Sequence, residues 1–294
     1  MRKNILVLLS CAALLGACAN DTETSTTTLT MGFAGLEDLG TDYVYEGWLI
    51  VDGAPVTAGR FSVDADGNPT PATIELDEAV VAAATTFVLT IEPTVGDDPA
   101  PSAVHILAGD IVGDSVDLTT SHGAALGTDF SSATGEFILE TPSSMAPEDY
   151  AQGIWWLVPG TDGMAPGLAL PTLPDGWTYE GWVVGPSGPV STGTFASPDG
   201  ADSDAAGPDA GPDGAGPPFP GQDFISPAQV LTGGYMAVIS VEPVPDNSPM
   251  PFAIKPLADM DLEDVMAPMT QSMNNIAADT VPAGSISLGL SQTE

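Results

Sequence analysis

The chain is poor in basic residues, and this shortage excludes whole classes of partner. Its 294 residues include only four Lys and Arg against 40 Asp and Glu, a formal net charge of −36. Such a surface repels nucleic acid and anionic lipid headgroups, so neither nucleic-acid binding nor a polybasic membrane patch is expected. Because the acids are scattered, we interpret them mainly as promoting solubility. Diffuse binding of divalent cations and electrostatic steering of a basic partner are the alternatives.

Cysteine and histidine are equally scarce. The two cysteines, Cys11 and Cys18, both lie near the N-terminus, so no disulfide is expected in the body of the protein. The two histidines, His105 and His122, do not accompany a nucleophile motif, and no Gly-x-Ser-x-Gly elbow, Ser-x-x-Lys pair, cysteine cluster or phosphate loop is present. The sequence therefore predicts a protein that is not an enzyme and has no cofactor. A hydrolase with a carboxylate base is the remaining enzyme alternative.

Long hydrophobic runs are also missing. The longest, residues 5–15, follows Arg2 and Lys3 and is too short to cross a bilayer, which takes about 20 apolar residues. A basic start followed by a short apolar run is typical of an export signal. The segment Leu15-Gly16-Ala17-Cys18 that ends the run resembles the lipobox of bacterial lipoproteins.

The lipobox resemblance implies a signal peptide at residues 1–17 and a lipid on Cys18 that anchors the protein to a membrane. Residues 18–28, rich in Thr, Glu and Ser, are predicted to be a flexible tether, so that the folded body begins near Leu29. Ala19 follows the cysteine in place of the Asp that retains enterobacterial lipoproteins in the inner membrane. By this resemblance the outer membrane, on its periplasmic or surface face, is favoured over the inner one.

Two blocks of the sequence occur twice. The segment 45–50, YEGWLI, returns at 179–184 as YEGWVV, an offset of 134 that also carries Gly59 and Phe61 onto equivalent residues. The strand-like segment ending in Glu92-Pro93 returns as one ending in Glu242-Pro243, at an offset of 150. Because the offset is larger for the second block than for the first, the second copy contains an insertion between the two blocks. This is the low-complexity segment 200–221, which is predicted to be a disordered surface loop.

Secondary-structure signals are those of short strands. Segments rich in β-branched and aromatic residues alternate with Gly, Pro, Asp and Asn, and helical periodicity is confined to residues 76–84 and 262–274. Many short strands, present twice, predict an all-β fold of two tandem antiparallel β-sandwich (Ig-like) domains, at residues 29–145 and 151–290. Segments 135–139 and 284–288 resemble each other and are expected to be the closing strand of their own copies.

The repeated pattern resembles a known family. An apolar Gly-Leu segment, Tyr-x-x-Trp, Pro-Val-x-x-Gly-x-Phe and a strand ending in Glu-Pro are similar to the extracytoplasmic C-terminal domain of anti-sigma-K factors. The resemblance implies a binding or sensor role outside the cytoplasm. Full-length members add a sigma-binding cytoplasmic domain and a membrane-spanning helix, neither of which is expected here. We therefore expect a non-enzymatic, membrane-anchored envelope lipoprotein that serves as a binding, sensor or scaffold module for an envelope protein. A calcium- or polysaccharide-binding accessory protein is the alternative.

The repeat also points to candidate site residues. Glu46 and Glu180 occupy the same place in the two copies, as do Glu92 and Glu242. The favoured interpretation is that each glutamate lies at a sheet edge or accepts backbone hydrogen bonds. The functional alternative is that they converge with the acidic turns into a ligand site or a site for a divalent cation.

Two further features carry weaker hypotheses. Asp64, Asp66 and Asn68 alternate like calcium-loop ligands, although a hairpin turn explains Asp-Gly equally well and is favoured. Trp155 and Trp156 point to opposite faces of one predicted strand, so one should be buried and the other exposed or at the contact with the first domain. An exposed Trp could stack on a sugar.

Overall fold

The computed structural model describes residues 25–161, 163–208, 216–246 and 248–289. The all-β prediction is confirmed, because nearly all regular structure is antiparallel strand and the sheets are curled. The proposed signal peptide and Cys18 lie outside the described residues. Within the described ranges no helix has the length and hydrophobicity that crossing a membrane requires.

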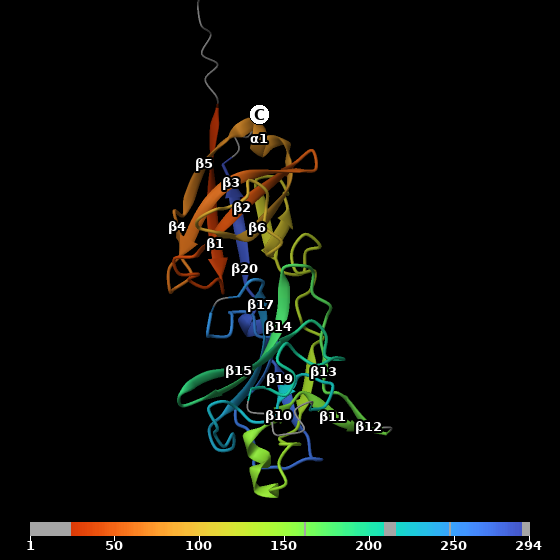
Figure 1. The fold of residues 1–294 in the computed structure, drawn as a ribbon. Helices are drawn as coiled ribbons and strands as arrows, with labels where there is room; N and C mark the ends of the chain where they lie inside the picture. Colours follow the sequence, from red (N-terminus) through yellow and green to blue (C-terminus); the bar gives the residue numbers. More distant parts are fainter. Residues whose placement is uncertain (1–24, 162, 209–215, 247, 290–294) are drawn as a thin grey trace, which may run out of the picture.

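The first unit is built on one nine-stranded sheet with the order β4-β3-β2-β6-β7-β8-β20-β1-β5 (Figure 1). The sheet curls until its ends approach each other: Ile74 of β5 lies so close to Gly59 of β3 that a side chain there would meet it. The elements are β1 (Thr26–Ala34), β2 (Tyr43–Val51), β3 (Ala54–Val63), β4 (Pro69–Thr70), β5 (Thr73–Asp77), α1 (Glu78–Ala83), β6 (Ala84–Pro93), β7 (His105–Asp110), β8 (Ser115–Thr119) and β20 (Ala283–Leu288).

The second unit is built on a seven-stranded sheet with the order β13-β9-β19-β18-β17-β14-β15, flanked by two small ribbons, β10-β16 and β11-β12. A short 3-10 helix, Pro147–Gln152, precedes the first ribbon. The elements are β9 (Thr134–Phe137), β10 (Ile154–Trp155), β11 (Leu157–Gly160), β12 (Gly163–Pro166), β13 (Leu168–Ala169), β14 (Trp177–Gly185), β15 (Gly188–Phe195), β16 (Gly221–Gln222), β17 (Met236–Pro243), β18 (Leu257–Asp259), β19 (Gln271–Asn275) and α2 (Ala277–Thr280).

The two units share one strand order, but they exchange their closing strands. In the first unit β20 pairs with β8 and β1, although it comes from the C-terminal end of the chain. In the second unit the same place, between β19 and β13, is taken by β9, which follows the first copy in sequence. Figure 1 shows β20 in blue beside the red β1. The expectation that each closing strand completes its own copy is therefore wrong, and contiguous boundaries at 29–145 and 151–290 do not describe the sheets.

The chain consequently crosses between the units twice, once before β9 and once through α2. Asn275 ties the two crossings together, because its side-chain amide donates to the carbonyls of Phe130 and Ala133 at 2.8 and 2.9 Å. Most buried apolar side chains of both units form one continuous cluster. Trp177 adds a direct link, since its indole Nε1 donates to the carbonyl of His105 in the first unit at 3.2 Å. The units are thus held together both covalently and by packing.

Among three local expectations, one is confirmed and two are wrong. The tether ends earlier than predicted, because β1 begins at Thr26 and Thr27 is buried. A helix does form at Glu78–Ala83, where Asp77 caps it by accepting from the Ala79 amide. Residues 262–274, by contrast, contain no helix but lead into β19.

Trp155 and Trp156 are both fully buried, so the prediction of one exposed Trp is wrong. Trp156 packs edge-on against Phe137 in the main core, with ring centroids 5.6 Å apart. Trp155 is covered by the segment that was predicted to be a disordered loop: Ala206 and Phe219 pack against it, both from the described ends of residues 200–221. The middle of that segment, residues 209–215, lies outside the described residues.

Candidate functional site

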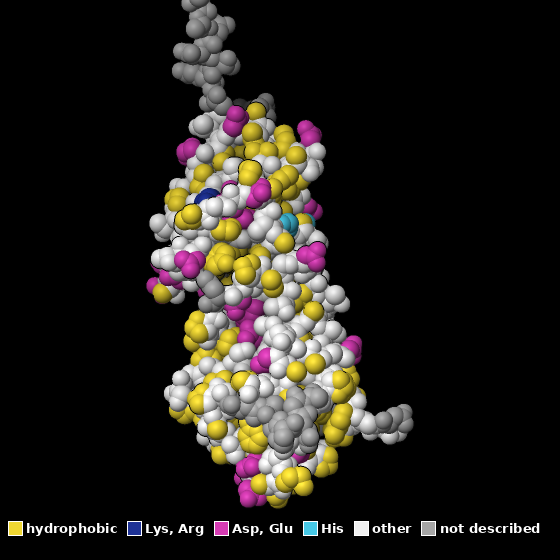
Figure 2. Space-filling view, viewed as in Figure 1, with side chains coloured by type: hydrophobic (Ala, Val, Ile, Leu, Met, Phe, Trp, Pro, Cys, Tyr) yellow, Lys and Arg dark blue, Asp and Glu magenta, His cyan; other side chains and the backbone are white. Residues whose placement is uncertain are grey.

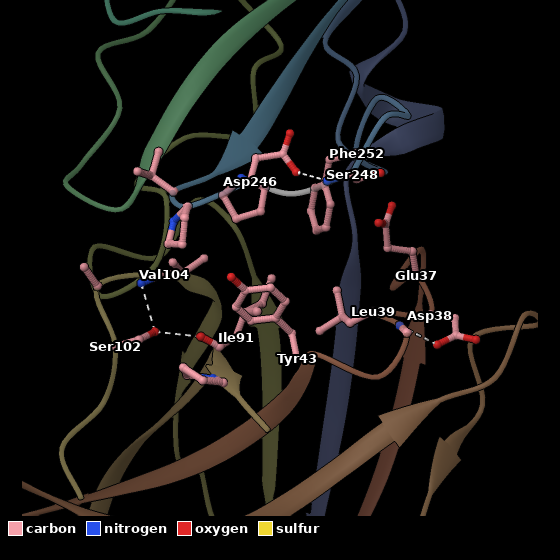
Figure 3. Close-up of a pocket in the computed structure, with 16 residues that line it drawn as sticks. Glu37, Asp38, Leu39, Tyr43, Ile91, Ser102, Val104, Asp246, Ser248 and Phe252 are labelled. Atoms are coloured by element: carbon pink, nitrogen blue, oxygen red, sulfur yellow. Dashed lines mark hydrogen bonds between the residues drawn. The ribbon is translucent and has the colours of Figure 1, made fainter. Parts of the chain in front are cut away.

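A cavity of about 360 Å³ opens between the two units. In Figure 3 the residues of the first unit lie below it, and Asp246, Ser248 and Phe252 of the second unit lie above. Its apolar floor consists of Tyr43, Leu39, Ile91 and Val104, and Phe252 faces them from the second unit. A site that needs both units to exist is the kind of concave, mostly apolar site in which ligands bind.

Hydrogen bonds shape the loops that form the cavity wall. The Ser102 hydroxyl donates to the carbonyl of Ile91 at 2.8 Å and accepts from the Val104 amide at 3.1 Å, which holds this turn against β6 (Figure 3). On the opposite side Asp246 accepts from the Ser248 amide at 2.8 Å. The wall is therefore preformed by local backbone contacts.

The rim of the cavity is acidic. Asp38 and Asp246 are exposed, and Glu37 is half-buried beside them. Burial raises the pKa of Glu37, while Lys255 of the second unit opposes this shift. Figure 2 shows acidic side chains at the waist between the units, where no dark blue group is visible on this face. The rim thus favours a ligand that carries positive charge.

The paired glutamates of the sequence prediction come together within each unit. In the first unit Glu46 and Glu92 are buried on adjacent strands, β2 and β6. Thr57 donates to Glu46 Oε1 at 2.5 Å, and Glu92 Oε1 accepts from Thr90 and from the Ser102 amide. Burial also raises the pKa of Glu92.

A guanidinium compensates this negative charge in the first unit. Arg60 Nε lies 3.4 Å from Glu46 Oε2, and its Nη2 lies 3.7 Å from the carboxylate of Asp97 and donates to the carbonyl of Pro93. Arg60 faces Glu46 directly across the β2-β3 ladder. The first cluster therefore holds three carboxylates, Glu46, Glu92 and Asp97, and one arginine that pairs with Glu46 and Asp97.

The second unit repeats the glutamates and their hydroxyl partners. Glu180 accepts from Ser191, and Glu242 accepts from Ser240 and from the Phe252 amide at 2.9 Å. The indole of Trp182 donates to Ser240 at 2.7 Å, as that of Trp48 does to Thr90 in the first unit.

The second cluster nevertheless differs in charge. The residue that faces Glu180 across the β14-β15 ladder, where the first unit has Arg60, is Thr194. Asp246 adds a third carboxylate, and one oxygen from each of the three acids lies within 4.8 Å of the others. Burial, together with the charges of Asp246 and Glu180, raises the pKa of Glu242 from 4.5 to about 7.

The third candidate, Asp64, Asp66 and Asn68, forms a closed turn. The carboxylate of Asp64 accepts from the amides of Asp66 and Asn68 at 3.0 and 2.9 Å and from the Asn68 side chain. These bonds hold the pKa of Asp64 below its usual value. The carboxylate of Asp64 thus serves as the acceptor of a tight turn.

Sequence reasoning missed three participants: Arg60, Thr194 and Asp246. Arg60 was recognisable in principle, because it is one of two basic residues in the folded body and its repeat equivalent is uncharged. Asp246 falls on Gly96 at the offset of 150, so the repeat gives it no acidic counterpart. The cavity between the units left no signal in the sequence, because it depends on how the units pack.

The chain thus has an all-β fold of two related units, with a cavity between them and buried carboxylate clusters within them. Residues 18–105 match the family described as anti-sigma-K factor rskA, C-terminal. The resemblance is therefore confirmed for the first copy, while the second copy lies outside the matched range. Neither the curated proteins nor the solved structures contain a match.

Proposed function

We propose that this protein is a non-enzymatic binding module of the cell envelope, held at the membrane by a lipid on Cys18, and that it binds a segment of a partner protein in the cavity between its units. The observation that carries the proposal is the cavity itself, with an apolar floor and an acidic rim supplied by both units. The match of residues 18–105 to an anti-sigma-K C-terminal domain supports a binding role.

The cavity indicates the chemistry of its ligand. Tyr43, Ile91 and Phe252 offer apolar surface that suits an apolar side chain, whereas Asp38 and Asp246 at the rim suit a neighbouring Lys or Arg. A cavity of about 360 Å³ accommodates one or two side chains rather than a folded domain. The expected ligand is therefore a short peptide segment with an apolar residue next to a basic one.

Selection from a random peptide library with the full chain tests this proposal. Enriched peptides should combine an apolar and a basic residue, and Asp38→Asn should weaken their binding several-fold. Asp52→Asn is the matched control, because it removes the same charge from the hairpin tip at the far end of β2. Peptides without this pattern, or binding unaffected by Asp38→Asn, would contradict the proposal.

The polysaccharide alternative loses its support, because Trp155, Trp156 and Trp177 are all buried and present no face for a sugar. Membrane attachment has its own test. Cys18→Ala should abolish incorporation of labelled lipid and release the protein from the membrane fraction, whereas retention of the variant in that fraction would overturn the lipid anchor.

A further inference from the structure

The two units compensate the charge of their buried glutamates in different ways. Each buries a pair of glutamates on neighbouring strands, and a buried carboxylate is costly unless a positive charge or hydrogen bonds compensate it. In the first unit Arg60 supplies the positive charge. In the second unit Thr194 stands in its place and supplies none.

In the described part of the second unit no other side chain replaces the guanidinium. Its basic residue there is Lys255, whose ammonium donates to the carbonyl of Phe252 at 2.6 Å. Among the described residues it forms no ion pair with Glu180, Glu242 or Asp246. The three carboxylates are thus left without a bonded cation.

Among the described residues, the side chain of Glu242 has an unsatisfied hydrogen-bond acceptor. Its side chain is fully buried, and its Oε1 accepts both the Ser240 hydroxyl and the Phe252 amide. Its Oε2 is buried too, yet has no hydrogen-bond partner in the described part of the chain. A buried carboxylate oxygen without a partner destabilises the folded state, and a ligand that bonds to it would remove this loss of stability.

We propose that Glu180, Glu242 and Asp246 bind one divalent cation, with calcium as the preferred ion, at the position that the Arg60 guanidinium occupies in the first unit. Two oxygens that each lie about 2.4 Å from calcium can be up to about 4.8 Å apart. This agrees with the 4.8 Å within which the three ligand oxygens lie. Carboxylate oxygens are the donors that hard cations such as calcium prefer, and the absence of nitrogen or sulfur donors disfavours zinc.

The cation site goes beyond the proposed peptide binding and does not depend on it, but the two sites share a residue. Asp246 belongs to the cluster and also lines the cavity between the units. A bound cation would hold the carboxylate of Asp246 in place. It would also neutralise part of the acidic rim, so calcium should alter the affinity of the cavity for basic peptides.

Titration of the full chain with Tb³⁺, a luminescent stand-in for calcium, tests the site. Trp182 is joined to Glu242 through Ser240, so it can sensitise a lanthanide bound there. The wild type should bind one Tb³⁺ per chain in 150 mM salt with this emission, and calcium should displace it. Asp246→Asn should weaken binding at least tenfold, Thr194→Arg should abolish it, and the control Asp52→Asn should leave it unchanged.

Because Asp246 is exposed, Asp246→Asn should fold, and it therefore tests the site even if Thr194→Arg fails to fold. Circular dichroism of each variant establishes whether it is folded. The absence of saturable binding, or binding that Asp246→Asn leaves unchanged, would overturn the cation site. Because the probe is the metal alone, such a result is separate from a failure of peptide binding in the cavity.

Discussion

Arg60 lies 3.4 Å from Glu46, and it is the only arginine in the part of the chain that the structure describes. The contact joins an Arg60 side chain that is 35% exposed to a Glu46 side chain that is 6% exposed. Pairs of this kind are costly to break from one side, because the buried member loses its partner while it stays out of water.

Arg60→Met should therefore destabilise the protein. The substitution keeps most of the apolar stem but leaves Glu46 and Asp97 without their cation. We expect a loss of about 2 kcal/mol in the free energy of unfolding, because Glu46 stays buried without its ion-pair partner while Arg60 itself is partly exposed. Urea denaturation in the presence of a chelator measures the loss. An unchanged midpoint would show that the pair contributes nothing.

The raised pKa of Glu242 predicts how stability depends on pH without divalent cations. Its pKa is about 7 in the folded protein and about 4.5 when unfolded, so the folded state binds the proton more tightly between these values. Its contribution is fully present below pH 4.5 and is lost as pH rises through 7. The difference between wild type and Glu242→Gln, measured by denaturation from pH 4 to 8, isolates this group from other acids.

Saturating calcium should remove the same pH dependence, because the bound cation favours the ionised carboxylate. The groups that face Glu242 are Glu180, Asp246 and Lys255. A wild type and a Glu242→Gln variant with parallel profiles in chelator would contradict the assignment.

The exchanged closing strands predict that each of them stabilises the unit formed by the other copy. Ile286 of β20 is buried in the first unit and Phe137 of β9 in the second. Ile286→Ala should cost about 2–4 kcal/mol and Phe137→Ala about 3–5 kcal/mol, because each leaves a cavity. Hydrogen exchange resolved by peptide locates the damage.

With Ile286→Ala, exchange should accelerate in β1 and β8, and with Phe137→Ala in β13 and β19. Each variant is thus the control for the other. The strand exchange would be wrong if Ile286→Ala loosened β19 while β1 and β8 stayed protected.

Most of the fold and site features that could be predicted from the sequence came from the internal repeat. It located equivalent strands in both copies and paired Glu46 with Glu180 and Glu92 with Glu242. It could not assign the closing strands, because segments 135–139 and 284–288 have the same local pattern and either can fill either place. The sheet that each strand joins depends on where the chain passes between the units and on how the units pack. Neither can be recognised in the local sequence.

Burial of polar and low-complexity segments was equally hard to predict. Segment 200–221 has a composition without core residues apart from Phe219, yet its described ends cover Trp155. The backbone passes so close at Gly216 that a side chain there would meet the indole ring. Glycine and alanine fit over a flat ring because they are small, and composition alone does not reveal this.

The central claim is that the same scaffold compensates its paired glutamates with an arginine in one unit and with a cation in the other. The reciprocal variant Arg60→Thr with Thr194→Arg tests it most directly, in a calcium-dependent hydrogen-exchange experiment. Calcium should protect the turn after β17 in the wild type, and the turn after β6, which carries Asp97, in the variant. Protection that stays at the β17 turn in both proteins, or is absent from both, would contradict the account.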